Sequence, residues 1–210
     1  MDLHLNLGQW IVIGLSAFLS IWYFIVLSQN RRRGLAAYRW LYRCLGEMGK
    51  VSHAEWIGSS NIGARLVVRK ATKPFRYVEA SYRLEPREFL PYWLFSRLRG
   101  KKDEVVIRVT LHFDSKASFE INKREIRDLL NRPPAGELVP QDPHIANADP
   151  AEIQARTVAN TFLSEFGASV EKMVLQREAP HLMIYARLKP LLRSPAESFL
   201  KTLLRLFQNT

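Results

Sequence analysis

The sequence has few of the features that mark a secreted protein. Its single cysteine, Cys44, cannot form an internal disulfide, and the chain contains no Asn-x-Ser/Thr glycosylation sequon. Secreted domains often use disulfides or N-glycans, whereas reducing compartments keep thiols free. Both absences fit a domain that faces the cytosol.

Catalytic motifs are also missing. Residues 58–63, GSSNIG, have the glycine spacing of a phosphate-binding loop, but Ala64 and Arg65 stand where that loop requires Lys and Ser/Thr. The stretch precedes a predicted strand instead of following one, which favours an ordinary turn. No nucleophile elbow or recognisable carboxylate pair occurs. We therefore assign no catalytic residue and no cofactor.

Metal ligands are too sparse to predict a metal site. His112 and Asp114 lie two apart on a predicted strand and point to the same side, which supplies two ligands without a third. Asp142, His144 and Asp149 offer further donors, but not with the spacing of an EF-hand.

Charge is absent between Trp10 and Ser28, which read WIVIGLSAFLSIWYFIVLS. As a helix this stretch would be about 28 Å long, which matches the hydrocarbon core of a bilayer. Trp22 and Tyr23 lie toward its second end, where aromatic side chains favour the head-group region. A cleaved signal peptide is the alternative, but the leader is not basic and no Ala-x-Ala-like site follows. We predict a transmembrane helix.

The flanks of this helix predict its orientation. The N-terminal flank carries only the acidic Asp2, whereas five arginines follow the helix. Because Lys and Arg accumulate on the cytoplasmic side, we expect a single-pass protein of the cell membrane with its N-terminus outside and its domain in the cytoplasm. Cys44 lies in the same basic segment, where a low-pKa thiol, a palmitoylated thiol and a packing residue are all open interpretations.

Positive charge is concentrated near the membrane. Residues 31–102 carry 17 Lys/Arg and 5 Asp/Glu, whereas residues 103–163 are net acidic. Such a surface favours anionic lipid head groups or an acidic protein partner. The candidate lipid- or anion-binding residues are Arg31, Arg32, Arg33, Arg39, Arg43, Lys101 and Lys102.

Hydrophobic periodicity predicts the remaining elements. Helices are expected at residues 31–48, 86–99, 124–130, 149–166 and from 194 onward, and strands at 65–71, 75–84, 104–114, 118–121, 170–178 and 181–188. The clearest strand is 104–114, on which the side chains of one face are apolar, namely Val105, Ile107, Val109, Leu111 and Phe113. The last helix is strongly amphipathic and is expected either to pack on the sheet or to lie in the membrane interface.

These elements predict an α+β fold in which amphipathic helices cover an antiparallel sheet. Two segments, RLVVRK…RLEP and KMVLQR…RLKP, resemble each other and suggest two αββα repeats. The expected divisions are 1–30 (tail and transmembrane helix), 31–50 (basic juxtamembrane helix), 51–131 (first half), 132–150 (Pro-rich loop or linker) and 151–210 (second half).

The leading functional hypothesis is a membrane-anchored cytoplasmic binding or scaffolding module. An anchored enzyme that uses the 132–150 loop is the alternative, because long loops often carry polar site residues. A third hypothesis is a nucleic-acid-binding domain in which Trp40, Trp56 and Trp93 stack on bases, but no RNA-binding consensus is present.

Overall fold

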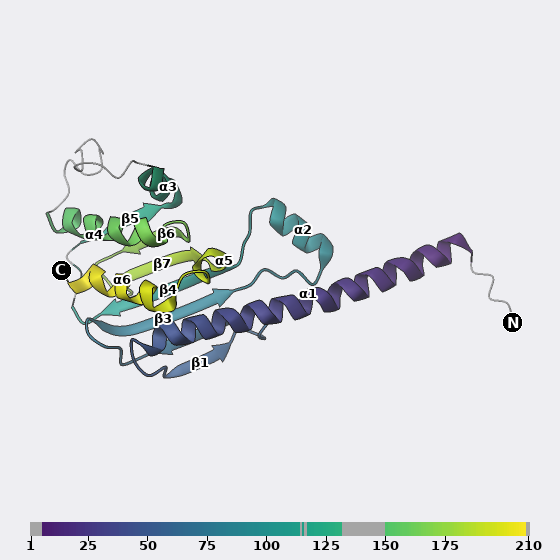
Figure 1. Ribbon diagram of the computed structural model, residues 1–210, viewed down its shortest axis with the longest axis horizontal. Helices are drawn as coiled ribbons and strands as arrows, with labels where there is room; N and C mark the ends of the chain where they lie inside the picture. The colour runs from purple at the N-terminus through teal and green to yellow at the C-terminus, as the bar shows by residue number, and fades with distance from the viewer. Residues whose placement is uncertain (1–5, 114, 116, 132–149, 209–210) are drawn as a thin grey trace.

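The computed structural model describes residues 6–113, 115, 117–131 and 150–208. Within them, seven antiparallel strands form one sheet in the order β1-β2-β3-β4-β7-β6-β5 (Figure 1). The strands are β1 His53–Trp56, β2 Gly63–Val68, β3 Phe75–Arg83, β4 Glu104–Leu111, β5 Phe119–Asn122, β6 Val170–Leu175 and β7 Leu182–Arg187. The helices are α1 Leu7–Gly46, α2 Leu90–Leu98, α3 Lys123–Asn131, α4 Pro150–Phe166, α5 Leu188–Leu191 and α6 Ala196–Gln208. The predicted α+β class is confirmed.

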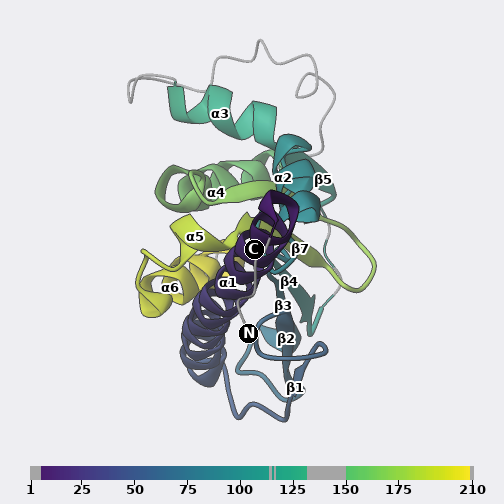
Figure 2. The ribbon, with the colours of Figure 1, turned by 90° about the vertical axis from the view of Figure 1, so that its right-hand side faces the viewer.

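The two faces of the sheet differ in polarity. In β4, Val105, Ile107 and Val109 are buried, and the residues between them are only half-buried. The second half of α1, together with α4 and α6, covers the apolar face, as Figure 2 shows. The opposite face carries many polar side chains, and the register aligns His53, Val67, Glu79, Arg108, Met183, Val174 and Glu120 in one row across all seven strands.

Helix α1 crosses residue 30 without a break, and its second half belongs to the core. One stripe of this helix is buried: Val26, Asn30, Gly34, Ala37, Leu41, Cys44 and Leu45. A Cβ at Gly34 would lie 1.9 Å from the carbonyl oxygen of Ser60, so the turn after β1 can approach the helix only at a glycine. The hydroxyl of Tyr82 donates to the carbonyl of Gly34 (2.8 Å).

The first half of α1 extends away from the sheet toward the N-terminus (Figure 1). Among the described residues, α1 is the one helix with the length and apolarity of a membrane span, and only 6% of its most apolar 18-residue window is buried. The core helix of a soluble protein would be mostly buried, so this exposure favours contact with lipid.

Most of the predicted elements are present, although several boundaries differ. The helix predicted to open at Pro86 begins instead at Leu90, because Glu85 and Arg87 are held by side chains of α1 and of the segment before β4. Phe89 precedes the helix with an extended backbone. Phe113 was expected on the buried face, but β4 ends at Leu111 and Phe113 is 42% exposed.

Two elements were not predicted. The strand β1 has four exposed residues and so no alternation of polarity, and α5 is a single turn that directly follows β7. Residues 132–149, including most of the predicted 132–150 loop and the predicted cap Asp149, lie outside the described residues. The helix expected after this cap is α4.

Candidate functional site

Helix α2 packs against the apolar half of α1. The ring of Trp93 lies 5.7 Å from that of Trp22, centroid to centroid. The indole N–H of Trp22 donates to the backbone carbonyl of Arg87 (3.3 Å), and Val26 is buried. Because Trp22 and Val26 belong to the charge-free stretch, the domain contacts α1 inside the segment that was predicted to lie in lipid.

The other side of α2 exposes large apolar side chains. Leu94 and Phe95 are about half exposed, and Leu98 is 80% exposed. Phe89, directly before the helix, and Tyr92 are also exposed. A helix that is apolar both toward its neighbour and toward the outside is typical of a non-aqueous environment.

A polar network fixes the ends of the α2 segment to α1. Nη2 of Arg87 donates to both carboxylate oxygens of Asp103 (2.8 and 2.7 Å), and both side chains are largely buried. Nη1 of Arg87 donates to the side-chain oxygen of Asn30 (2.8 Å), which is fully buried in α1. The amide of Asn30 donates to the carbonyl of Glu85 (3.2 Å). Bidentate, charge-assisted bonds are strong and directional, so this network holds α2 in a defined position.

A cavity of about 440 Å³ lies between α1, α2 and α5. It is lined by four residues of α1, two of α2, two of α5 and three from the segments next to α2 and α5. They are Trp22, Val26, Gln29, Arg33, Arg87, Trp93, Arg97, Asp103, Leu188, Lys189 and Leu192.

The cavity has an excess of positive charge. Asp103 neutralises Arg87, whereas Arg33, Arg97 and Lys189 form no ion pair within the described part of the chain. The guanidinium of Arg97 lies 5.6 Å from the centroid of the Trp93 ring, a cation–π distance. The indole N–H of Trp93 is buried, and no described residue accepts its hydrogen bond. These groups can bind an anion.

The predicted anion-binding residues are all exposed, but they do not form one site. Arg33 alone lines the cavity. Arg32, Arg39 and Arg43 recur at spacings of seven and four, which places them on the face of α1 opposite the buried stripe. The remaining predicted residues are Arg31, Lys101 and Lys102.

The sequence did not single out Arg87, Arg97 or Lys189. A signal for Arg97 exists, because this arginine ends an apolar helix inside the basic region 31–102. Lys189 lies in a part of the sequence with little excess charge and reaches the cavity only because β7 leads into α5 there.

Cys44 is a packing residue. Its side chain is buried, and this burial, with a smaller contribution from the charge of Glu47, raises the pKa of the thiol to about 12. A thiol needs access and a low pKa to react, so the basic segment around Cys44 does not create a reactive thiolate.

One cluster of charges on the open face of the sheet is fully paired. Glu79 accepts hydrogen bonds from Arg65 (2.7 Å), Arg108 (2.9 Å) and the hydroxyl of Tyr77 (2.9 Å). Burial by itself would raise the pKa of Glu79, but the bonds from Arg65 and Tyr77 outweigh it and lower the pKa. This cluster joins three strands and leaves no carboxylate available for acid–base chemistry.

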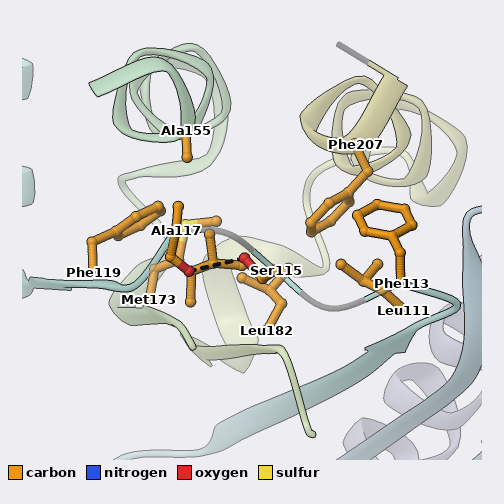
Figure 3. Close-up of a pocket in the computed structure, with 10 residues that line it drawn as sticks. Leu111, Phe113, Ser115, Ala117, Phe119, Ala155, Met173, Leu182 and Phe207 are labelled. Atoms are coloured by element: carbon orange, nitrogen blue, oxygen red, sulfur yellow. Dashed lines mark hydrogen bonds between the residues drawn. The ribbon is translucent and has the colours of Figure 1, made fainter. Parts of the chain in front are cut away.

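A second cavity lies between the end of β4, α4 and α6 and is apolar (Figure 3). Its lining includes Leu111, Phe119 and Phe207, and the hydroxyl of Ser115 donates to the carbonyl of Ala117 across one side. Its volume of about 20 Å³ is close to that of one water molecule, so it is a packing gap.

Within the described ranges, no group of three or more His, Cys, Asp or Glu side chains is placed to hold a metal ion. His112 is exposed just after β4. Its predicted partner Asp114 lies outside the described residues, as do Asp142, His144 and Asp149.

No protein-family model matches this chain, and no curated protein matches it in sequence.

Proposed function

We propose that this chain is a single-pass membrane protein whose cytoplasmic domain is a binding module for anionic lipid head groups. The observation that carries the proposal is the contact of Trp93 in α2 with Trp22, which belongs to the charge-free stretch of α1. This contact brings the surface of the domain to the bilayer, so the anchor does more than tether a distant domain.

The contact also sets the depth of α2. If the hydrocarbon core ends near Ser28, Trp22 lies about 9 Å below that level along the helix axis. Interfacial helices lie about 5–10 Å deep in the boundary between head groups and acyl chains. At that depth Leu94, Phe95 and Leu98 would be covered by lipid, and each large apolar side chain gains about 1.5–3 kcal/mol when it is fully buried.

Basic residues surround this interfacial region. Arg31, Arg32 and Arg33 follow the membrane span directly, and Lys101 and Lys102 follow α2. Each basic residue near an anionic surface contributes about 1 kcal/mol of attraction. This arrangement supports both the preference for anionic lipid and the cytoplasmic side of the domain, where such lipids and flanking arginines are concentrated.

The distance of each arginine along α1 limits which of them can contact lipid. Arg39 and Arg43 lie about 16 and 22 Å beyond Ser28 along the helix, outside the screening length of about 10 Å at 0.1 M salt. We therefore assign the lipid contacts to the first arginines and to the α2 region, and expect Arg39 and Arg43 to face water or an acidic protein partner.

Cysteine labelling in intact cells tests the topology. Cys44 is buried, so a single introduced cysteine reports its own exposure. A membrane-impermeant maleimide should label Asn6→Cys from outside, whereas Lys70→Cys in the turn after β2 should react only after lysis. The opposite pattern would refute the proposed orientation, and extraction of the protein by alkaline carbonate would refute the anchor.

Lysine acylation of the full chain in lipid nanodiscs tests the lipid preference. Lys101 and Lys102 should react more slowly in discs with about one-third anionic lipid than in neutral discs, and added salt should remove the difference. Lys70 is the control, because its backbone lies next to Gly49 beyond the far end of α1. Equal rates in neutral and anionic discs would reject the head-group preference.

A further inference from the structure

The cavity between α1 and α2 has the chemistry of a site for one ligand. We propose that it binds the phosphate head group of a single anionic phospholipid from the adjoining leaflet, with Arg33, Arg97 and Lys189 around the phosphate. This inference rests on the proposed function and names a ligand for its membrane-facing surface.

The wall that α1 contributes changes character along the helix axis. Trp22, Val26, Gln29 and Arg33 follow at spacings of four, three and four, so they share one face. Over about 16 Å this face passes from aromatic and aliphatic to polar and then to cationic. A phospholipid has the same order from acyl chain through ester to phosphate, whereas a free phosphate would use only the cationic end.

The lining of the cavity has charges that the described part of the chain does not neutralise. Arg87 is already bound to Asp103, which leaves Arg33, Arg97 and Lys189 to attract an anion. These three come from α1, α2 and α5, so the site forms only when the three elements are assembled as in Figure 1. Guanidinium groups suit phosphate because they donate two parallel hydrogen bonds.

Trp93 supplies a directional contact. Its ring lies against that of Trp22, 5.7 Å between centroids, and Arg97 lies over it at 5.6 Å, so the indole is held in place. Its buried N–H has no acceptor in the described residues, and an unpaired buried donor costs about 1–3 kcal/mol. A phosphate or ester oxygen of a lipid in the cavity would accept this hydrogen bond.

The size of the cavity fits this ligand. Its volume of about 440 Å³ lies in the range of small-molecule sites, and Trp93 and Arg97 of α2 form part of its wall. A head group with the glycerol end of its lipid can enter from the Trp22 side, which the proposed function places at the bilayer.

Native mass spectrometry of the full chain released from nanodiscs tests the site. The discs contain phosphatidylcholine with phosphatidic acid as the anionic probe, and the measured quantity is the phosphatidic acid retained per protein. The comparison is between Arg33→Ala and Arg39→Ala, since both are exposed arginines of α1 with equal charge, but only Arg33 lines the cavity. We expect about a tenfold loss of retained lipid for R33A, the scale of one charge-assisted contact, and less than a twofold loss for R39A.

Arg97→Gln provides a second variant in a different helix and should reproduce the loss seen for R33A. Equal losses for R33A and R39A, or no preference of the wild-type chain for phosphatidic acid, would overturn the cavity assignment. The acylation difference at Lys101 and Lys102 is measured separately, so the general lipid preference can survive that result. In neutral discs, glycerol 1-phosphate is the soluble probe. Its absence from the released protein supports a lipid ligand, and retention equal to that of phosphatidic acid would overturn the lipid as the source.

Discussion

Helices α2 and α6 both contain several large apolar side chains, but the structure places these side chains differently. In α6, Phe199 and Leu203 are fully buried. In α2, Phe95 and Leu98 are largely exposed. Both helices contact α1: α6 contacts the second half of α1, and α2 contacts its apolar first half. The apolar content of a helix therefore does not determine what covers it.

The surroundings of α6 explain the difference. Trp40 of α1 lies 5.6 Å from Phe199, ring to ring, and donates its indole N–H to the carbonyl of Ser194 (2.8 Å). Phe162 and Phe166 of α4 contact the other sides of Phe199. The apolar side of α6 is filled by protein, so packing on the sheet is confirmed over the alternative of a membrane-interface helix. We propose that lipid covers the exposed side of α2.

Truncating one phenylalanine in each helix should give the largest contrast. Phe199→Ala should lower the free energy of unfolding by about 3–5 kcal/mol, because it leaves a cavity between α1, α4 and α6. Phe95→Ala should change it by less than about 0.5 kcal/mol in detergent micelles, since Phe95 packs little against protein. Chemical unfolding of the full chain in micelles measures both. A comparable loss for Phe95→Ala would show that α2 covers protein core.

Alanine substitution of two glycines in α1 should affect stability differently in its two halves. Gly34→Ala should destabilise the chain by about 1–3 kcal/mol, because the new Cβ would meet the carbonyl oxygen of Ser60 at 1.9 Å. Gly14→Ala should be neutral or slightly stabilising, because nothing lies within 4 Å of its Cβ position and alanine favours helix. Unfolding in micelles tests this as well, and equal effects would contradict the division of α1.

The sequence could predict features that depend on local patterns, but not those that depend on contacts between distant residues. The charge-free stretch and the alternation in β4 are local patterns, and so are the apolar runs at 170–178 and 181–188. They gave the membrane-like helix, the central strand and the strands β6 and β7 correctly. The cavity depends on residues far apart in the chain, such as Trp22 with Trp93. Their contact depends on the position of α2, which the network of Arg87, Asp103 and Asn30 fixes, and no periodicity encodes that network.

The charged residues show a smaller contrast. Arg33, Arg97 and Lys189 at the cavity form no ion pair with a described residue, whereas Glu79 accepts three hydrogen bonds. Glu79→Gln should remove about 1 kcal/mol of stability at neutral pH, the scale of hydrogen bonds from partly exposed arginines to this buried carboxylate. The folded pKa of Glu79 lies below the ordinary value of 4.5, so its contribution is complete above that pH and is lost as the pH falls through the folded pKa. The stabilities of wild type and variant should therefore converge below pH 4.5.

The control for this titration is Glu197→Gln, which removes an exposed carboxylate with no ion pair in the described residues. It should leave the pH profile unchanged. A wild-type advantage over Glu79→Gln that persisted unchanged down to pH 3 would contradict the assignment to the Glu79 carboxylate.

The proposed function depends above all on the depth of α2 in the bilayer. A spin label on Leu98→Cys measures this depth. In the full chain in lipid vesicles, the label should collide more readily with dissolved oxygen than with a water-soluble nickel complex, because oxygen partitions into lipid. A label on Lys70→Cys at the far end of the domain should show the opposite preference. If the label at position 98 collided with the nickel complex as readily as the label at position 70 does, α2 would lie in water and the proposed function would be wrong.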